Sequence, residues 1–233
     1  MPEPRRTVLV TRPEPGAGET AARLERAGFV PILAPMLDIR PLAAPPPPPA
    51  DAILLTSRNG LLGLPPGPIT APVFAVGRAT ERAARARGAT AVAGADGNAE
   101  DLAALIRARL PAGSTLLLPA AAGQGGALAA ALRAAGYAVH LHPCYEARPA
   151  DTLPEPARAA LAAGRIAAAL FFSAETARAF VRAVRRAGLE TATEPVTACA
   201  ISPAVTVALE PLVWRHVRVA GRPNQEALLA LLA

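Results

Sequence analysis

Residues Thr7–Pro41 read TVLVTRPEPGAGETAARLERAGFVPILAPMLDIRP, and a matching pattern returns at Thr115–Pro149 as TLLLPAAAGQGGALAAALRAAGYAVHLHPCYEARP. The offset stays at 108 positions throughout, so Ala27-Gly28-Phe29 aligns with Ala135-Gly136-Tyr137. Each copy holds a short apolar run, a longer Ala-rich stretch of helical period, and a second apolar run. The glycine between them falls where a left-handed helix C-cap favours it. Each copy is therefore predicted to form a strand–helix–strand unit.

Further matches continue the repeat in the same order along the chain. Leu54–Thr56 resembles Phe171–Ser173, Pro72–Ala75 resembles Pro195–Ala198, and Asn98–Leu102 resembles Asn224–Leu228. A repeat of roughly 110 residues has the size of a domain and not of a solenoid unit. Nearly continuously apolar strands that alternate with helices are typical of a parallel sheet covered on both faces. The sequence therefore predicts two similar α/β domains.

The apolar runs and the helical periods give an expected order of elements. Strands are expected at Thr7–Thr11, Val30–Leu33, Ala52–Thr56, Val73–Val76, Thr115–Leu118, Ala138–Leu141, Ala167–Phe172, Val196–Ile201 and Val217–Ala220. Helices are expected at Gly18–Ala27, Ser57–Leu62, Ala79–Arg87, Ala99–Leu110, Gly125–Ala135, Pro156–Ala163, Ala174–Ala187, Pro203–Leu209 and Gln225–Leu232. Ala43–Ala50 contains five consecutive prolines and is expected to be an exposed spacer, because proline cannot donate to a sheet.

The composition excludes several kinds of chemistry. All 24 basic residues of the 233 are Arg, and the sequence contains no Lys. A lysine Schiff base and the lysine of a phosphate-binding P-loop are therefore both excluded. Cys144 and Cys199 lie far apart, which predicts neither a CxxC motif nor a disulfide framework and indicates a reducing cytoplasm. With three histidines, no metal site is expected.

The charge balance indicates an anionic ligand. The net charge is +6, and basic proteins favour anionic partners. The arginines are scattered and aromatic residues make up only 3% of the chain, so nucleic acid is not an expected partner. Pro and Gly interrupt the longest uncharged stretch, Leu110–Leu132, and Val8–Val10 is too short for a signal peptide, so no membrane segment is expected. A ligand with carboxylates or phosphates is favoured.

Polar residues follow the predicted strands, where parallel α/β domains bind ligands. The candidates for substrate binding are Arg12, Thr56, Ser57, Asn59, Gly77, Arg78, Thr80, Ser173 and Ser202. Hydroxyls and free N–H groups at helix N-termini bind anions, although Ser and Thr at these positions also serve simply as N-caps. Tyr145 follows Pro143-Cys144, where the chain leaves a strand, and could donate a proton or anchor a hydrogen bond.

Over nearly its whole length, the chain resembles the uroporphyrinogen-III synthase family. The resemblance rests on Val10–Pro13, Leu55–Asn59, Val76–Thr80, Tyr145, Phe172–Thr176 and Ile201–Pro203. It implies two similar parallel-sheet α/β domains joined by a two-stranded β-linker, with the ligand cleft between them. Residues 1–35 plus 149–233 would form one domain, residues 41–142 the other, and residues 36–40 and 143–148 the linker strands.

The resemblance also implies an activity. The family's enzymes are cofactor-independent, cyclising hydro-lyases of tetrapyrrole, porphyrin and heme biosynthesis. Their substrate is hydroxymethylbilane, a linear tetrapyrrole with eight carboxylates. Loss of its hydroxyl leaves an azafulvene, ring D attacks through its substituted carbon to form a spiro intermediate, and reclosure with ring D inverted gives uroporphyrinogen III. A cytoplasmic monomer without metal is expected, with hydroxymethylbilane synthase as a candidate partner.

The resemblance assigns roles to particular residues and leaves one alternative open. Tyr145 is the candidate catalytic residue that assists loss of the hydroxyl. Two segments depart from the family's pattern: Pro119–Gln124 replaces an Arg-Gly pair and a later Arg, and Ala204 and Val205 replace threonines. The alternative is a non-catalytic two-domain sensor or binding protein that uses the same cleft for a tetrapyrrole or another polycarboxylate.

Overall fold

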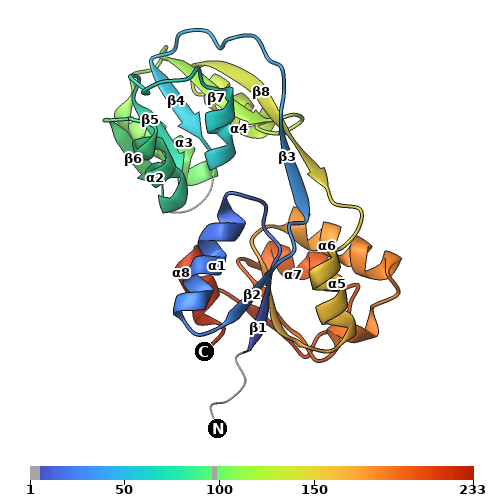
Figure 1. Ribbon diagram of the computed structural model, residues 1–233. Helices are drawn as coiled ribbons and strands as arrows, with labels where there is room; N and C mark the ends of the chain where they lie inside the picture. Colours follow the sequence, from blue (N-terminus) through green and yellow to red (C-terminus); the bar gives the residue numbers. More distant parts are fainter. Residues whose placement is uncertain (1–5, 96–98) are drawn as a thin grey trace. The chain divides into compact units, whose positions relative to one another are not determined.

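The computed structural model describes residues 6–95 and 99–233 and divides the chain into two compact units (Figure 1). Unit 1 combines the residues up to Asp38 with Arg148–Ala233, and unit 2 is Ile39–Ala147. Unit 1 is thus built from two separate segments of the chain, while unit 2 is continuous.

Unit 1 is a five-stranded sheet in the order β11-β10-β9-β1-β2, and its four neighbouring pairs are parallel. Its strands are β1 (Thr7–Val10), β2 (Val30–Leu33), β9 (Ile166–Phe171), β10 (Thr197–Ala200) and β11 (His216–Val219). Its helices are α1 (Gly16–Arg26), α5 (Glu155–Ala162), α6 (Ala174–Arg186), the 3-10 turn η2 (Thr191–Thr193), α7 (Pro203–Leu209) and α8 (Gln225–Ala230).

The side chains of β1 show how both faces of this sheet are buried. Val8 and Val10 pack with α1 and α8, whereas Leu9 packs with α5, α6 and α7. Successive strand residues point to opposite faces, so an uninterrupted apolar run supplies two cores. On the Leu9 face the Phe171 and Phe180 rings meet edge to face with their centroids 5.3 Å apart.

Unit 2 is a six-stranded sheet in the order β3-β8-β7-β4-β5-β6. Its strands are β3 (Leu37–Pro41), β4 (Ala52–Leu55), β5 (Val73–Val76), β6 (Val92–Ala95), β7 (Thr115–Ala121) and β8 (Ala138–Pro149). Its helices are the 3-10 helix η1 (Arg58–Gly63), α2 (Arg78–Ala86), α3 (Ala99–Arg109) and α4 (Gly126–Ala134). Leu54 packs with α3 and α4, while Leu55 packs with α2, so this sheet is also covered on both faces.

The repeat predicted from the sequence corresponds to equivalent structure. The β1-α1-β2 segment matches β7-α4-β8, and the glycines after the two helices, Gly28 and Gly136, have φ of +86° and +90°. The strand order β2-β1-β9-β10-β11 of unit 1 has the same pattern as β8-β7-β4-β5-β6 of unit 2. The predicted pair of similar parallel α/β domains is confirmed. In each sheet the strand order reverses at one point, between β1 and β9 and between β7 and β4.

Two strands lead from one unit to the other. The backbone N–H of Ala150 donates to the carbonyl of Met36, and that of Leu42 to the carbonyl of Cys144, both at 2.9 Å. β2 ends at Leu33 and β3 starts at Leu37, so the chain is interrupted between these two strands. β8, in contrast, is continuous from Ala138 to Pro149. β8 accommodates Pro143 beside a register shift between Ala120 and Ala121 of β7, where proline's missing N–H is tolerated.

Several elements differ from the sequence-based expectation. β6 and η2 were not expected, and the segment after β4 is a 3-10 helix instead of an α-helix. β7 extends to Ala121 and so includes Pro119, and β8 continues past Leu141 to Pro149. Among the described residues, no helix is long and apolar enough to cross a membrane.

Candidate functional site

The predicted binding residues lie at the carboxyl edge of the sheet in each unit. In unit 1, Arg12 follows β1, Ser173 follows β9 and Ser202 follows β10, and these three strands are neighbours. In unit 2, Thr56, Ser57 and Asn59 follow β4, while Gly77, Arg78 and Thr80 follow the adjacent β5. Both sets lie beside the point where the strand order reverses, the usual ligand position in open α/β sheets. The cleft between the two domains remains a prediction.

Arg12 is held on two sides of its guanidinium group. Its Nη1 donates to Thr20 Oγ1 at 3.5 Å and to Gln225 Oε1 at 3.4 Å, and its Cζ lies 4.3 Å from the centre of the Phe172 ring. A Cβ atom on Gly16 would lie 2.4–2.6 Å from Nε, Cζ and Nη2. The guanidinium therefore occupies space that is open only because residue 16 has no side chain.

The two residues that accept from Arg12, Thr20 and Gln225, also hydrogen-bond to each other. The Nε2 of Gln225 donates to Thr20 Oγ1 at 3.3 Å, and that hydroxyl donates to the Gly16 carbonyl at 2.8 Å. Thr20 is completely buried, so its position is fixed by packing as well as by hydrogen bonds. Residues from α1, α8 and the segment after β9 thus restrict Arg12 to a small range of orientations.

The two serines of unit 1 differ in what their side chains do. Ser173 Oγ accepts a hydrogen bond from the Thr176 N–H at 3.2 Å and lies 3.1 Å from Thr176 Oγ1. Because Thr176 Oγ1 donates its proton to the Ser173 carbonyl, the Ser173 hydroxyl proton points to Thr176. Ser202 makes no capping bond through its side chain at the start of α7. The capping interpretation is therefore observed for Ser173, and it does not apply to Ser202.

The segment after β4 combines a cap with exposed polar groups. Ser57 Oγ accepts from the Asn59 N–H at 3.3 Å, a bond that does not use the serine's own proton. Thr56 is exposed, and Ser57, Arg58 and Asn59 are half-buried. This edge of unit 2 can offer hydroxyl and amide donors to an anion.

The segment after β5 depends on a glycine. Gly77 has φ +76°, a conformation that L side chains rarely adopt, and its carbonyl accepts from the N–H groups of Thr80 and Glu81. Nothing lies within 4 Å of a Cβ built there, so the backbone conformation alone favours glycine. Arg78 is exposed and Thr80 is buried in the first turn of α2.

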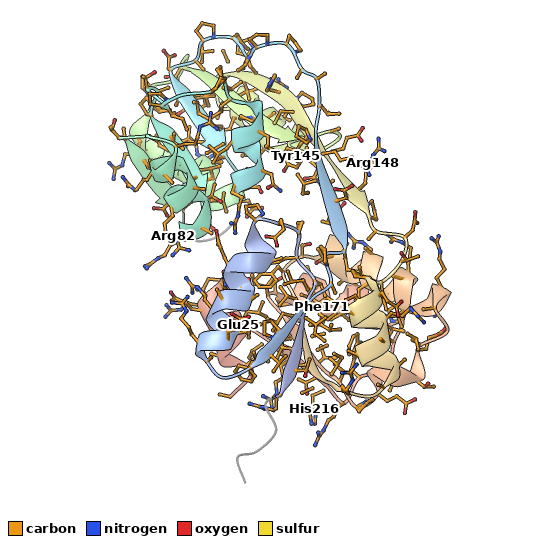
Figure 2. The ribbon with its side chains drawn as sticks, in the orientation of Figure 1. Glu25, Arg82, Tyr145, Arg148, Phe171 and His216 are labelled. Atoms are coloured by element: carbon orange, nitrogen blue, oxygen red, sulfur yellow. The ribbon has the colours of Figure 1, made fainter. Side chains whose placement is uncertain are left out.

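Tyr145 lies on β8, opposite Ala121 at the end of β7 (Figure 2). Its side chain is 6% exposed and packs with Ala121 and Cys144, with Ile39 and Ala147 beside them. The β7–β8 register shift at this point makes Tyr145, and not Cys144, the partner of Ala121. The bulge thereby sets the face of the sheet to which this tyrosine belongs.

The two thiols are poor candidates for nucleophiles. Burial raises the pKa of the Cys144 thiol, and burial also raises the pKa of Cys199 to about 11. A reactive cysteine needs a lowered pKa and access to solvent, and both of these side chains are buried. Within residues 6–95 and 99–233, no three His, Cys, Asp or Glu side chains group in a way that could hold a metal ion.

Sequence reasoning identified Arg12 and missed the residues that fix it, namely Gly16, Phe172 and Gln225. Asn224-Gln225-Glu226 has a counterpart in Asn98-Ala99-Glu100, but a repeat match carries no sign of a contact with β1. The expected helix starts at Gly18 and the observed α1 at Gly16, so no signal in the sequence pointed to Gly16.

Comparison with known proteins identifies the family. A family model described as uroporphyrinogen-III synthase HemD matches residues 18–230. A mutant uroporphyrinogen III synthase from the extremely thermophilic bacterium Thermus thermophilus is similar in structure, with a TM-score of 0.53, 22% identity and 97% of each chain covered. The uroporphyrinogen-III synthetase of Helicobacter pylori has a TM-score of 0.60, 18% identity and 98% of each chain covered. No curated protein sequence matches the chain.

Proposed function

Because the chain belongs to the uroporphyrinogen-III synthase family, we propose that it cyclises and dehydrates hydroxymethylbilane, with inversion of ring D, to give uroporphyrinogen III. The match over residues 18–230 carries this proposal, since it includes elements of both α/β units. The substrate class suits the chain as well. A linear tetrapyrrole with eight carboxylates is a polyanion. This protein has a net charge of +6, and it contains arginine but no lysine.

The reaction requires a folded substrate more than strong acid–base chemistry. After the hydroxyl leaves as water, the substituted carbon of ring D must attack the azafulvene to form the spiro intermediate. That intermediate must then fragment and reclose with ring D inverted. Holding the reacting ends together supplies much of such a rate enhancement. We assign the carboxylate contacts to Arg12 in unit 1 and to the donors of Thr56–Asn59 and Gly77–Thr80 in unit 2.

We assign loss of the hydroxyl group to Tyr145. A phenol that donates a hydrogen bond or a proton to the departing oxygen lowers the barrier of that step. The position of this tyrosine at the carboxyl end of β7, with its ring held by Ala121 and Cys144, supports the assignment. Ser202, which has no capping bond through its side chain, is assigned a carboxylate contact through its hydroxyl, and Ser173 one through the free backbone N–H groups at the N-terminus of α6.

We also propose that the enzyme acts as a cytoplasmic monomer without metal or organic cofactor and receives its substrate from hydroxymethylbilane synthase. The reaction removes one water and changes no oxidation state, so its balance needs no redox partner. Full activity after exhaustive dialysis against EDTA is the expected result. Activity that is lost there and restored by an added metal ion would refute this part of the proposal.

The decisive experiment is cyclisation of freshly prepared hydroxymethylbilane, with the product isomers separated. The expected product is the III isomer, whereas closure without inversion gives a different isomer that chromatography resolves. Tight binding of the linear substrate with no III isomer above the enzyme-free control would refute the enzyme. That outcome would indicate a binding protein of the same fold.

A further inference from the structure

A pocket of about 260 Å³ lies within unit 1 at the amino ends of its strands, the edge opposite Arg12, Ser173 and Ser202. Arg6 and Val8 line it from the start of β1, Ala167 and Ala168 from β9, and Thr197 from β10. Figure 2 shows His216, which also lines it, at this end of the unit. The strands of the sheet separate this pocket from the predicted substrate residues, by about 13 Å along β1 alone.

The charge of the pocket is mostly positive. Its lining includes the guanidinium groups of Arg6, Arg215 and Arg218 and the imidazole of His216, and among the described residues it includes no Asp or Glu side chain. Ala233 also lines it, and its backbone oxygen accepts from Arg218 Nη1 at 3.4 Å. Three arginines around one small space repel one another unless an anion or solvent compensates them. The composition of the lining therefore indicates a negatively charged occupant.

Two of the three arginines are fixed in place. Arg218 Nη1 donates to the carbonyl oxygen of Leu231 at 2.7 Å, and Arg6 Nη2 donates to that of Leu232. The Arg6 guanidinium also lies 5.2 Å from the centre of the Phe29 ring. These bonds satisfy carbonyls at the end of α8 and use only part of the five donors on each guanidinium. The other N–H donors of these two guanidinium groups are already held in place. A ligand that binds them therefore costs less side-chain conformational entropy.

Arg215 completes the site differently. Its backbone N–H donates to the Val196 carbonyl at 3.0 Å, while within the described part of the chain its guanidinium has no hydrogen-bond partner. The apolar side chains of Val8, Phe29 and Leu232 also contribute to the walls of the pocket. The four cationic side chains are exposed, so an ion can reach them directly from solvent.

We propose that this pocket binds a small oxyanion, either inorganic phosphate or a short carboxylate. A volume of about 260 Å³ lies just below the range of sites for drug-sized ligands, so a whole tetrapyrrole does not fit. Planar guanidinium groups match the geometry of phosphate and carboxylate oxygens. This site is separate from the one assigned to hydroxymethylbilane and does not depend on that assignment.

The test uses the full chain, with phosphate, succinate and the uncharged succinamide titrated separately by isothermal calorimetry at constant ionic strength. Arg215→Gln is the test variant. Arg178→Gln, an exposed change on α6 with the same loss of charge, is its control. Saturable 1:1 binding of phosphate, of succinate or of both is expected, with none of succinamide. Arg215→Gln should weaken it about tenfold, because a hydrogen bond to a charged group is lost. Arg178→Gln should change it less than about twofold, because a distant exposed charge is screened by salt.

Two results of the titrations would overturn the proposal. One is the absence of saturable binding by either anion, and the other is an equal loss in Arg215→Gln and Arg178→Gln, which would indicate general attraction to a basic protein. A spectrum of ¹⁵N-labelled protein adds a second readout, in which the amides of Thr197, His216 and Arg218 should shift on titration. Shifts confined to the segments after β4 and β5 would place the anion elsewhere and would also refute the pocket. The comparative affinities of phosphate and succinate identify the natural class of ligand.

Discussion

Replacing Gly16 by Ala should disable Arg12 without unfolding the protein. The new Cβ would lie 2.4–2.6 Å from the guanidinium atoms, whereas ordinary contacts begin at 3.4 Å, so the group must retreat by about 1 Å. That movement takes it off the Phe172 ring and away from Gln225. The far end of a flexible side chain can make it, so the backbone of α1 need not shift.

The effect on stability should be small because two contributions oppose each other. Gly→Ala in a helix stabilises by about 0.4–1 kcal/mol through the unfolded chain. Loss of a cation–π contact costs about 0.5–1 kcal/mol. Substrate affinity should respond far more, because a misplaced guanidinium forfeits a charge-assisted hydrogen bond of about 1.5–3 kcal/mol. The expected fall in kcat/KM is about 10- to 100-fold.

The assay is steady-state cyclisation with isomer separation, together with thermal unfolding, for three variants. Gly18→Ala is the matched control, since its Cβ would lie 3.5 Å from the nearest atom, Glu14 Oε2, and should leave kcat/KM within about twofold. Arg12→Ala sets the full effect of losing the guanidinium. If Arg12→Ala impairs catalysis while Gly16→Ala behaves like Gly18→Ala, the positioning argument is wrong. If Arg12→Ala is itself silent, the assignment of Arg12 to substrate fails.

Three further predictions concern other residues. Tyr145→Phe keeps the ring packing and removes the hydroxyl, so kcat should fall about tenfold or more in the cyclisation assay while the unfolding temperature stays constant; an unchanged kcat would remove Tyr145 from the reaction. Ser173→Ala should lose about 0.5–2 kcal/mol in urea unfolding because it ends the cap on Thr176, whereas Ser202→Ala should lose under about 0.5 kcal/mol, and equal losses would contradict the assigned caps. The raised pKa of Cys199, about 11 when folded against 9.0 for the free thiol, means that the unfolded chain releases this proton first as the pH rises. Stability should therefore decrease between pH 9 and 11, less steeply in Cys199→Ala, and an identical slope in both proteins would argue against the buried neutral thiol.

The main elements of both units could be predicted because their signals are local. Val8, Leu9 and Val10 are consecutive apolar residues with strand propensity, and each lies buried on one or the other face of the sheet. β6 escaped prediction because Val92-Ala93-Gly94-Ala95 has a single β-branched residue. The structure explains Gly94, since a Cβ there would clash with the carboxylate of Glu81. This contact between β6 and the preceding helix α2 cannot be seen in the local sequence pattern of β6.

The assembly of unit 1 and the setting of Arg12 could not be derived from the residues alone. Both copies of the repeat look alike, so nothing local decides that β1 pairs with β9. The resemblance to a known family supplied the exchange between the halves. Phe172 and Gln225 reach Arg12 only through that pairing and through α8, at sequence separations of 160 and 213 residues. The predicted strand ends located the polar groups of the site. Contacts between residues far apart in the sequence determine how Arg12 is oriented.

The split construction of unit 1 bears on how the protein forms during synthesis on the ribosome. When β2 has been made, one flank of β1 is still without its neighbour, since Val8, Leu9 and Val10 pair with Ala168, Ala169 and Leu170 of β9. Elongation from Leu33 to Phe171 takes roughly 7–28 s at usual rates. During that interval unit 2, which is continuous in sequence, can complete its own sheet. We expect chaperones to bind the apolar strand β1 until its partner β9 has been synthesised.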